Sequence, residues 1–259
     1  MFKDSAKGQW LKIRNTVFFF GKSERSLSEL QSELKVQICQ LNQTHSDITL
    51  QAIPSFTDDF DKAKEQTADG HFTDQPNRAL IIKTADCIPL LMYCQDQEFL
   101  LAIHAGWRGV ASKIAPKALE MLNKEYPSLT NAKWKAFIGP HISFENFEVG
   151  LDVADQILGT IGLSSSEGLS GDPKVLPFYN TFLKKHLESN KCYINLHEVL
   201  SSQMTDYKIE WHNTEIDTID DLEFASYRRN GKSAGRNLSA IFRADHNFDW
   251  DKWNTWLNS

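Results

Sequence analysis

Residues 84–110 read TADCIPLLMYCQDQEFLLAIHAGWRGV, and this stretch decides the expected fold. Its two apolar runs, residues 88–93 and 98–104, are short and apolar at almost every position, which is typical of strands covered on both faces. Only CQDQ separates them, so we expect two neighbouring strands inside a core. Cys87 stands just before the first run and His104 closes the second.

A two-residue loop at Gln95 and Asp96 would join the two runs in an antiparallel hairpin. In that register Cys87 faces His104. Directly opposed residues have Cβ atoms about 4.5–5.5 Å apart, which suits a shared metal ion or a hydrogen-bonded Cys–His pair. The pairing depends on the loop length, because a shift of register would separate the two side chains.

Each of these residues also has a purely structural interpretation. A cysteine beside an apolar run is usually a small buried hydrophobic group, and a histidine at a strand end usually has a structural partner. The segment HAGWRG favours chemistry instead, because Gly106 and Gly109 allow the backbone to approach a ligand closely. Arg108 adds a planar fork of donors that suits phosphate or carboxylate.

The composition is that of an ordinary globular protein. The 259 residues are 41% hydrophobic and 24% charged, with a formal net charge of -6. No Lys/Arg-rich block, signal-peptide pattern or apolar run of roughly 20 residues is present. We therefore expect a cytoplasmic protein with free thiols at its four cysteines, binding neither nucleic acid nor membrane.

Hydrophobic periodicity predicts strands and helices in an irregular order. Strands are expected at residues 16–20, 79–83, 88–93, 98–104, 134–138 and 238–244. Helices are expected at residues 26–41, 110–127, 150–162, 178–189, 195–207 and 249–259, with Pro116 kinking its helix or marking a late start. Residues 163–174 form the expected loop. This mixture favours an α+β or mixed-sheet α/β fold.

A catalytic zinc usually has three protein ligands and one open position, so Cys87 and His104 need a third partner. The residues alone leave five histidines open, and they scarcely separate His45, among turn formers, from His71. The five candidates are His45, His71, His141, His197 and His212.

Several motifs together resemble the laccase-domain family, whose members are described as polyphenol oxidases and as purine nucleoside phosphorylases. They are QTHS (residues 43–46), ADGHFTDQPNRALIIKTADCIPLLM (68–92), LLAIHAGWRGV (100–110), AFIGPHISFENFEVG (136–150) and SYRRNGKSAGR (226–236). The resemblance implies a single α/β domain over residues 1–259, with mixed sheets flanked by helices. It also implies a zinc site made by His45, Cys87 and His104.

The function implied by the resemblance is zinc-dependent phosphorolysis of adenosine, inosine or methylthioadenosine, together with adenosine deamination. A purine nucleoside and phosphate are then the partners of a monomer or homodimer, and copper is the alternative metal. Candidate catalytic residues are Arg108, Asp86 and His71; candidate substrate-binding residues are Gln43, Arg108, Arg228 and Arg229.

The chain departs from the family pattern around the substrate. Family members usually carry a longer segment after the first strand, with a TRxGG-like and an SLN-like stretch. Ser46 replaces the glycine of the family's QxHG, and Asn213 stands where a Cys-Thr pair is common. The expected metal ligands are all present, so metal binding is a firmer expectation than the identity of the nucleoside.

Three other functions remain open. Cys87 and His104 could act as nucleophile and base of an amide or thioester hydrolase. A copper-dependent phenol oxidase is disfavoured, because multicopper chemistry needs several copper sites and the eight histidines include no HxH pair. A non-catalytic zinc protein is the third alternative.

Overall fold

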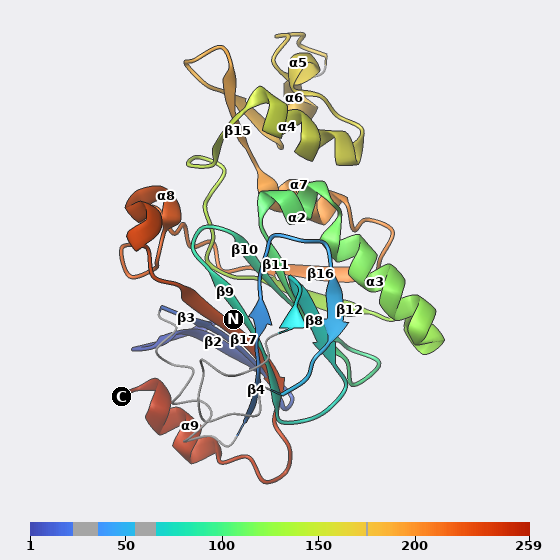
Figure 1. Cartoon of the computed structure of the whole chain (residues 1–259), viewed down its shortest axis with the longest axis vertical. Helices are drawn as coiled ribbons and strands as arrows, with labels where there is room; N and C mark the ends of the chain where they lie inside the picture. The colour runs from blue at the N-terminus through green and yellow to red at the C-terminus, as the bar shows by residue number, and fades with distance from the viewer. Residues whose placement is uncertain (23–35, 55–65, 175) are drawn as a thin grey trace.

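The structure is a computed structural model, and it describes residues 1–22, 36–54, 66–174 and 176–259. Within these residues it has an α/β fold in which two six-stranded mixed sheets pack face to face (Figure 1). The expected fold class is confirmed. Among the described helices, none combines the length and the apolar character needed to cross a membrane.

The first sheet has the strand order β1-β2-β3-β17-β9-β4. Its strands are β1 (Lys3–Ser5), β2 (Gly8–Ile13), β3 (Thr16–Gly21), β4 (Gln37–Cys39), β9 (Arg78–Thr84) and β17 (Asn237–Arg243). The second sheet has the order β16-β12-β10-β11-β8-β6. Its strands are β6 (Thr49–Gln51), β8 (Gly70–Thr73), β10 (Ile88–Cys94), β11 (Leu100–Ala105), β12 (Trp134–Ile138) and β16 (Ile209–Asn213).

Two smaller sheets and a set of helices complete the described part of the chain. The small sheets contain β13 (Glu148–Gly150), β14 (Leu183–Lys185) and β15 (Lys191–Ile194), and the pair β5 (Leu41–Asn42) and β7 (Gln66–Thr67). The α-helices are α2 (Trp107–Ala111), α3 (Ile114–Glu125), α4 (Leu151–Leu158), α5 (Ser165–Gly168), α6 (Leu176–Tyr179), α7 (Leu196–Ser202), α8 (Tyr227–Asn230) and α9 (Trp250–Leu257). Single 3-10 turns are η1 (Pro127–Leu129), η2 (Gly159–Ile161) and η3 (Gly231–Ser233).

Strand residues alternate between two core layers, which explains why whole strands are apolar. In β3, Phe18 and Phe20 point into the layer between the large sheets, while Val17 and Phe19 face the layer beneath α9. In β10, Leu91 joins the layer between the sheets. Its neighbours Leu90 and Met92 join the largest layer, which α2, α3, α4 and α7 cover.

The expected hairpin of β10 and β11 exists, but its predicted register is wrong. The two strands pair with Pro89 opposite His104, and Cys94 donates its backbone N–H to Phe99. The connecting loop is therefore longer than two residues, and Cys87 lies beyond the last paired position. Since no Gly-containing turn marks the loop in the sequence, its length could not be predicted.

Two expected helices are wrong over most of their described residues; in the second, only Phe178 and Tyr179 are helical. Residues 26–35 of the first lie outside the described residues, but β4 replaces its end, because Ile38 and Cys39 are buried in a parallel pair with β9. In the second, at 178–189, α6 ends at Tyr179, and Leu183 then pairs with Ile194 in β14. The tertiary pairing overrides helical spacing at both places.

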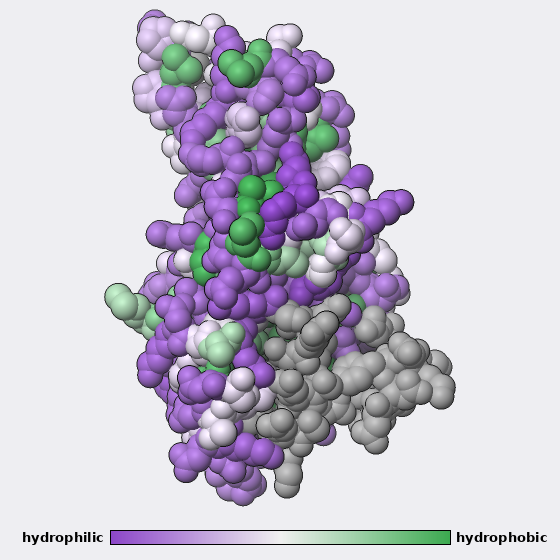
Figure 2. Space-filling model, turned by 90° about the vertical axis from the view of Figure 1, so that its left-hand side faces the viewer, coloured by the Kyte–Doolittle hydropathy of each residue, from purple (hydrophilic) through white to green (hydrophobic). Residues whose placement is uncertain are grey.

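The other helices and the loop expected from the sequence lie close to their predicted positions. Lys113, with a φ of 58°, separates α2 from α3 and so gives the late helix start expected near Pro116. Helices α4, α7 and α9 lie where periodicity predicts them, and the expected loop at 163–174 carries the short α5. The face in Figure 2 is mainly hydrophilic, with only small hydrophobic patches.

Candidate metal centre

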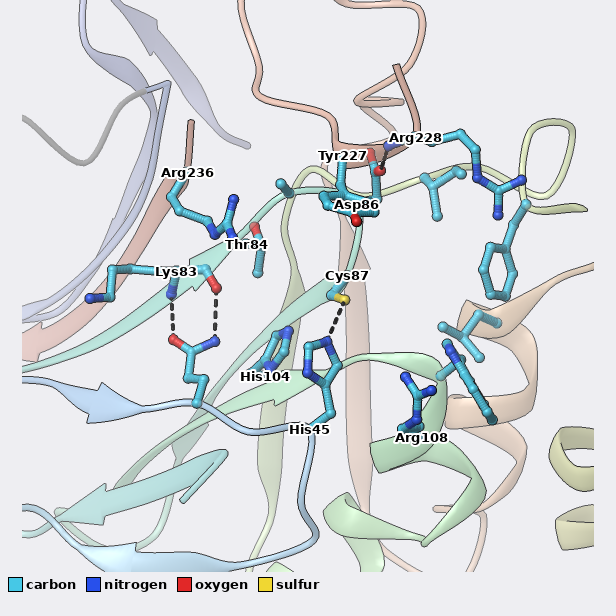
Figure 3. A pocket seen from close by; sticks show the side chains of 16 residues that line it. His45, Lys83, Thr84, Asp86, Cys87, His104, Arg108, Tyr227, Arg228 and Arg236 are labelled. Atoms are coloured by element: carbon cyan, nitrogen blue, oxygen red, sulfur yellow. Dashed lines mark hydrogen bonds between the residues drawn. The ribbon is translucent and has the colours of Figure 1, made fainter. Parts of the chain in front are cut away.

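His45, Cys87 and His104 converge at one edge of the two large sheets. One ligand atom from each lies within 4.8 Å of the others, and the Cys87 Sγ is 3.8 Å from the His45 Nε2 (Figure 3). His104 is buried, Cys87 is half-buried and His45 is exposed. We call these three residues the His–Cys–His cluster. The protein covers the cluster on the side of His104, and the cluster is open to solvent on the side of His45.

Turns in unusual backbone conformations bring the three side chains together. His45 follows β5 and has a φ of 62°, while Asp86, directly before Cys87, has a φ of 85°. Non-glycine residues rarely adopt such values, and they concentrate at functional sites where the surrounding structure holds them in place. His104 comes from the regular strand β11 and supplies the fixed part of the cluster.

Asp69, which sequence analysis did not single out, holds two of the three side chains in position. Its Oδ1 lies 2.7 Å from the His104 Nδ1 and accepts a hydrogen bond of 2.9 Å from the His45 backbone N–H. Its Oδ2 accepts from the backbone N–H groups of Thr44 and Ser46 and from the Ser46 hydroxyl. A carboxylate that accepts the His104 Nδ1 proton leaves Nε2 to face the cluster, as metal-ligating histidines require.

Ser46, the departure from the family glycine, therefore contributes to the site. Its hydroxyl donates to Asp69 over 2.7 Å. Asp69 itself is fully buried and stands directly before Gly70 in the motif ADGH. A buried carboxylate needs several donors, and the polar sequence around Asp69, QTADGHFTD (residues 66–74), gives no signal that this residue is buried.

Gly106 supplies the space that the cluster needs. A Cβ at this position would lie 2.8 Å from the His45 Cδ2 and 3.0 Å from the Cys87 Sγ. The first contact is shorter than real Cβ atoms show and the second is tighter than most, so a side chain here would displace the His45 ring and crowd the Cys87 sulfur. The glycine of HAGW is thus explained by close packing rather than by a turn.

The electrostatics of the cluster favour the thiolate. Burial raises the pKa of Cys87, but hydrogen bonds from His104 and His45 outweigh it and bring the pKa down to about 6. Burial likewise opposes protonation of His104, while Asp69 and Cys87 raise its pKa to about 9. For Asp69, burial is outweighed by hydrogen bonds from His104 and Ser46, which hold its pKa below the usual range.

The donor set fits a divalent metal ion. In tetrahedral zinc sites with Zn–S near 2.3 Å and Zn–N near 2.0 Å, sulfur and nitrogen ligands lie about 3.5 Å apart. The 3.8 Å between the Cys87 Sγ and the His45 Nε2 is close to this value. Two imidazoles and a thiolate are also ligands that zinc and copper accept. The cluster can therefore bind a metal ion.

A cavity of about 590 Å³ adjoins the cluster. Of the residues predicted from sequence, it is lined by the three cluster residues and by Gln43, Asp86, Arg108 and Arg228. Its wall further includes Lys83, Thr84, Ala85, Trp107, Ile142, Phe147, Leu196, Tyr227 and Arg236, which sequence analysis did not assign. Arg236 is the last residue of the motif SYRRNGKSAGR. Its place in a motif shared with the family was the sequence signal that could have identified it as a residue of the site.

Two of the predicted residues that line the cavity already have structural partners. The Gln43 amide donates to the Lys83 carbonyl and accepts from the Lys83 N–H, which ties the loop of His45 to β9. Asp86 accepts from the Thr218 hydroxyl at 2.7 Å and from the Arg228 N–H at 2.6 Å. One carboxylate oxygen thus holds the start of α8 and the other holds the loop at Thr218, so both oxygens already have partners, which makes Asp86 a poor candidate for proton transfer.

His71 and Arg229, also predicted from sequence, do not line this cavity. His71 is fully buried on β8, because its strand position points it into the core. Burial lowers its pKa to about 3, with the Ile81 backbone opposing this shift. Arg229 donates to the carbonyl oxygens of Thr218, Ile219 and Phe224, so its guanidinium holds a loop together.

Known proteins share both the sequence pattern and the fold. A purine nucleoside phosphorylase of Clostridium acetobutylicum is 29% identical over 204 residues, which cover 78% of this chain and 75% of that protein. A purine nucleoside phosphorylase of Bacteroides thetaiotaomicron is 32% identical over 177 residues, covering 67% and 60% of the two chains.

Two solved structures have the same fold at low identity. YlmD of Geobacillus stearothermophilus matches with a TM-score of 0.76 at 19% identity, covering 94% of this chain and 99% of that chain. The hypothetical protein YfiH of Bacillus licheniformis matches with a TM-score of 0.74 at 20% identity, covering 93% and 98%. The sequence model of one family matches residues 22–244, and the chain therefore belongs to the multi-copper polyphenol oxidoreductase laccase family.

Proposed function

We propose that the protein is a zinc-dependent purine nucleoside phosphorylase. The observation that carries the proposal is a three-donor cluster, open on one side, beside a cavity large enough for a nucleoside. The cationic side chains Arg108, Arg228 and Arg236 on the cavity wall suit an anionic co-substrate. The names of the relatives support this substrate class.

The reaction transfers a pentosyl group from a purine base to hydrogen phosphate. A phosphate oxygen forms a bond to C1′ as the C1′–N9 bond breaks, and N9 takes the electron pair and the proton that hydrogen phosphate releases. Zinc held by His45, Cys87 and His104 would supply Lewis-acid stabilisation of developing negative charge. The positive charge on the cavity wall attracts the phosphate, and the apolar wall around Trp107 excludes water from the base.

Adenosine deamination is proposed as a second reaction of the same site. A metal ion with one open position can lower the pKa of water toward neutrality. A metal ion held by the cluster would supply this activation; addition of water at C6 of adenosine with loss of ammonia gives inosine, which is itself a substrate for phosphorolysis.

Incubation of the purified protein with phosphate and adenosine, inosine or methylthioadenosine tests the proposal. We expect release of free base and a pentose 1-phosphate, measured by chromatography, from protein that contains one zinc per chain by mass spectrometry. His104→Ala should lose both the metal and the activity, whereas His212→Ala, at a half-buried histidine outside the cavity, should retain both. Zinc-loaded protein that releases no base would contradict the proposal.

A Cys–His hydrolase is the second candidate, favoured by the lowered pKa of Cys87. The two functions compete for the same thiolate, so a metal measurement separates them. In the phosphorylase, Cys87 should react with iodoacetamide only after chelation; in the hydrolase, it should react at once. Copper is the alternative metal, and the same metal analysis decides between copper and zinc.

A further inference from the structure

The cavity beside the His–Cys–His cluster has two chemically different walls. One wall belongs to the largest core layer: Ile142, Phe147 and Leu196 are members of it, and Trp107 packs against it. The other wall contains Thr84 and Arg236. In Figure 3, these two residues lie on the opposite side of the cluster from Arg108.

Arg108 and Arg228, the two sequence-predicted arginines that line the cavity, belong to the apolar wall. The Arg108 guanidinium lies 4.4 Å from the centre of the Trp107 ring. Arg228 donates to the Glu148 carbonyl at 2.9 Å, directly beside Phe147. Both guanidinium groups therefore stand where a flat, apolar base would lie, and a cation over an aromatic face also leaves room for stacking.

The opposite wall holds a hydroxyl that lacks a partner. Thr84 is 1% exposed, and its Oγ1 makes no hydrogen bond in the described part of the chain. A buried hydroxyl without a partner is costly and uncommon, so each instance calls for an explanation. A ligand that accepts its proton would supply one.

Arg236 lies on the same wall of the cavity as Thr84. It precedes Asn237, which pairs with Thr84 across β17 and β9. The Arg236 Nη1 donates to the carbonyl oxygens of Ala234 and Gly235, and among the described residues no carboxylate forms an ion pair with it. Its side chain is exposed, so the remaining guanidinium donors can turn toward an anion at Thr84.

We propose that Thr84 and Arg236 form an oxyanion subsite for inorganic phosphate, and that the wall around Trp107 takes the purine base. The assignment rests on the proposed phosphorylase function and deepens it. It places the pentose between the two walls, next to the cluster, so that phosphate and base stand on opposite sides of C1′. It also moves the phosphate from Arg108, the first candidate from sequence, to Arg236.

Titration calorimetry with inorganic phosphate on the metal-loaded protein tests the subsite without turnover. Thr84→Val keeps the shape of the side chain, and we expect about a 10-fold weaker phosphate affinity because one hydrogen bond to a charged group is lost. The melting temperature should stay unchanged or rise, since the hydroxyl has no partner to lose. Arg236→Gln should weaken binding by about 10- to 100-fold.

Lys232→Gln is the matched control, because it removes one positive charge from the neighbouring turn η3 outside the cavity. It should leave phosphate affinity unchanged. In steady-state kinetics, Thr84→Val and Arg236→Gln should raise KM for phosphate and spare KM for the nucleoside, and Arg108→Gln should do the reverse. Thr84→Ser, which keeps the hydroxyl, should behave as the wild type.

The outcomes separate the subsite from the reaction. If the wild type releases free base while Thr84→Val and Arg236→Gln bind phosphate normally, the subsite is overturned and the phosphorylase stands. If wild-type protein binds phosphate through these two residues but releases no base, the subsite stands and the phosphorylase fails. If Arg108→Gln loses phosphate binding while Thr84→Val and Arg236→Gln keep it, the phosphate binds at the Arg108 wall and the Thr84–Arg236 subsite is overturned.

Discussion

At the residue scale, one carboxylate accounts for much of the geometry of the candidate metal centre. Asp69 accepts hydrogen bonds from the backbone of the His45 loop and contacts the ring of His104. These partners lie 24 and 35 positions away in the chain. Their arrangement therefore depends on packing of distant segments.

Asp69→Asn should weaken metal binding by about 10- to 100-fold, the range seen when a residue that orients metal ligands is replaced. An amide cannot accept on both sides, so at least one donor of the His45 loop loses its partner. Competition with a fluorescent zinc chelator measures the affinity. Asp47→Asn, at an exposed carboxylate paired with Lys117, provides the control and should leave the affinity unchanged.

Gly106→Ala should also weaken metal binding, although it removes no ligand. The new methyl group would enter the space now shared by His45 and Cys87. The same chelator competition measures the effect. Gly159→Ala meets no atom within 4 Å and should bind metal as the wild type does; equal affinities in both variants would refute the packing argument.

At the element scale, the sequence predicted which strands exist better than how they pair. Periodicity placed β10 and β11 correctly, because burial on both faces leaves an uninterrupted apolar run. The register failed because it depends on the length of a loop with no characteristic turn residues. Cys87 and His104 still converge, since the turn at Asp86 carries Cys87 back toward His45.

The third ligand shows the limit of the residues taken alone. His45 and His71 looked alike in sequence, and only the family resemblance separated them. The structure gives the physical reason: His71 lies on the regular strand β8 inside the core, whereas His45 lies on a turn at the edge of the sheets. The roles of Asp69 and Thr84 could not be predicted, because they arise from contacts between distant segments.

Helix α9 should be a large contributor to stability, because it closes the outer core of the first sheet. Trp253 is fully buried there, between Phe19 and Phe242. Trp253→Ala should lower the free energy of unfolding by about 3–5 kcal/mol. Denaturant titration measures it. Trp250→Ala, at a partly buried position of the same helix, should cost clearly less; equal losses would contradict this account.

At the scale of the whole molecule, two buried histidines should make stability depend on pH. Burial lowers the pKa of His71 to about 3 and that of His141 to about 4, against an unfolded value near 6.5. The unfolded chain therefore binds more protons below pH 6.5. Stability should fall as the pH drops from 6.5 toward these values, by at most about 1.4 kcal/mol per pH unit for each histidine.

His71→Leu should flatten part of this dependence, because it removes a buried imidazole whose pKa is lowered by burial. Urea titrations at pH 7, 6 and 5 give the slope. His246→Gln, at an exposed histidine, should keep the wild-type slope. A slope unchanged in His71→Leu would show that His71 does not stay neutral in the folded protein.

The small sheet β13-β15-β14 has a further consequence for the molecule. Phe147 directly precedes β13 and Leu196 follows β15 closely, so one wall of the cavity is attached to this sheet. The three donors of the His–Cys–His cluster come instead from β11, from the turn after β5 and from the turn between β9 and β10. A change in the length or tilt of the small sheet would therefore reshape this wall of the cavity and leave the three donors of the His–Cys–His cluster in place.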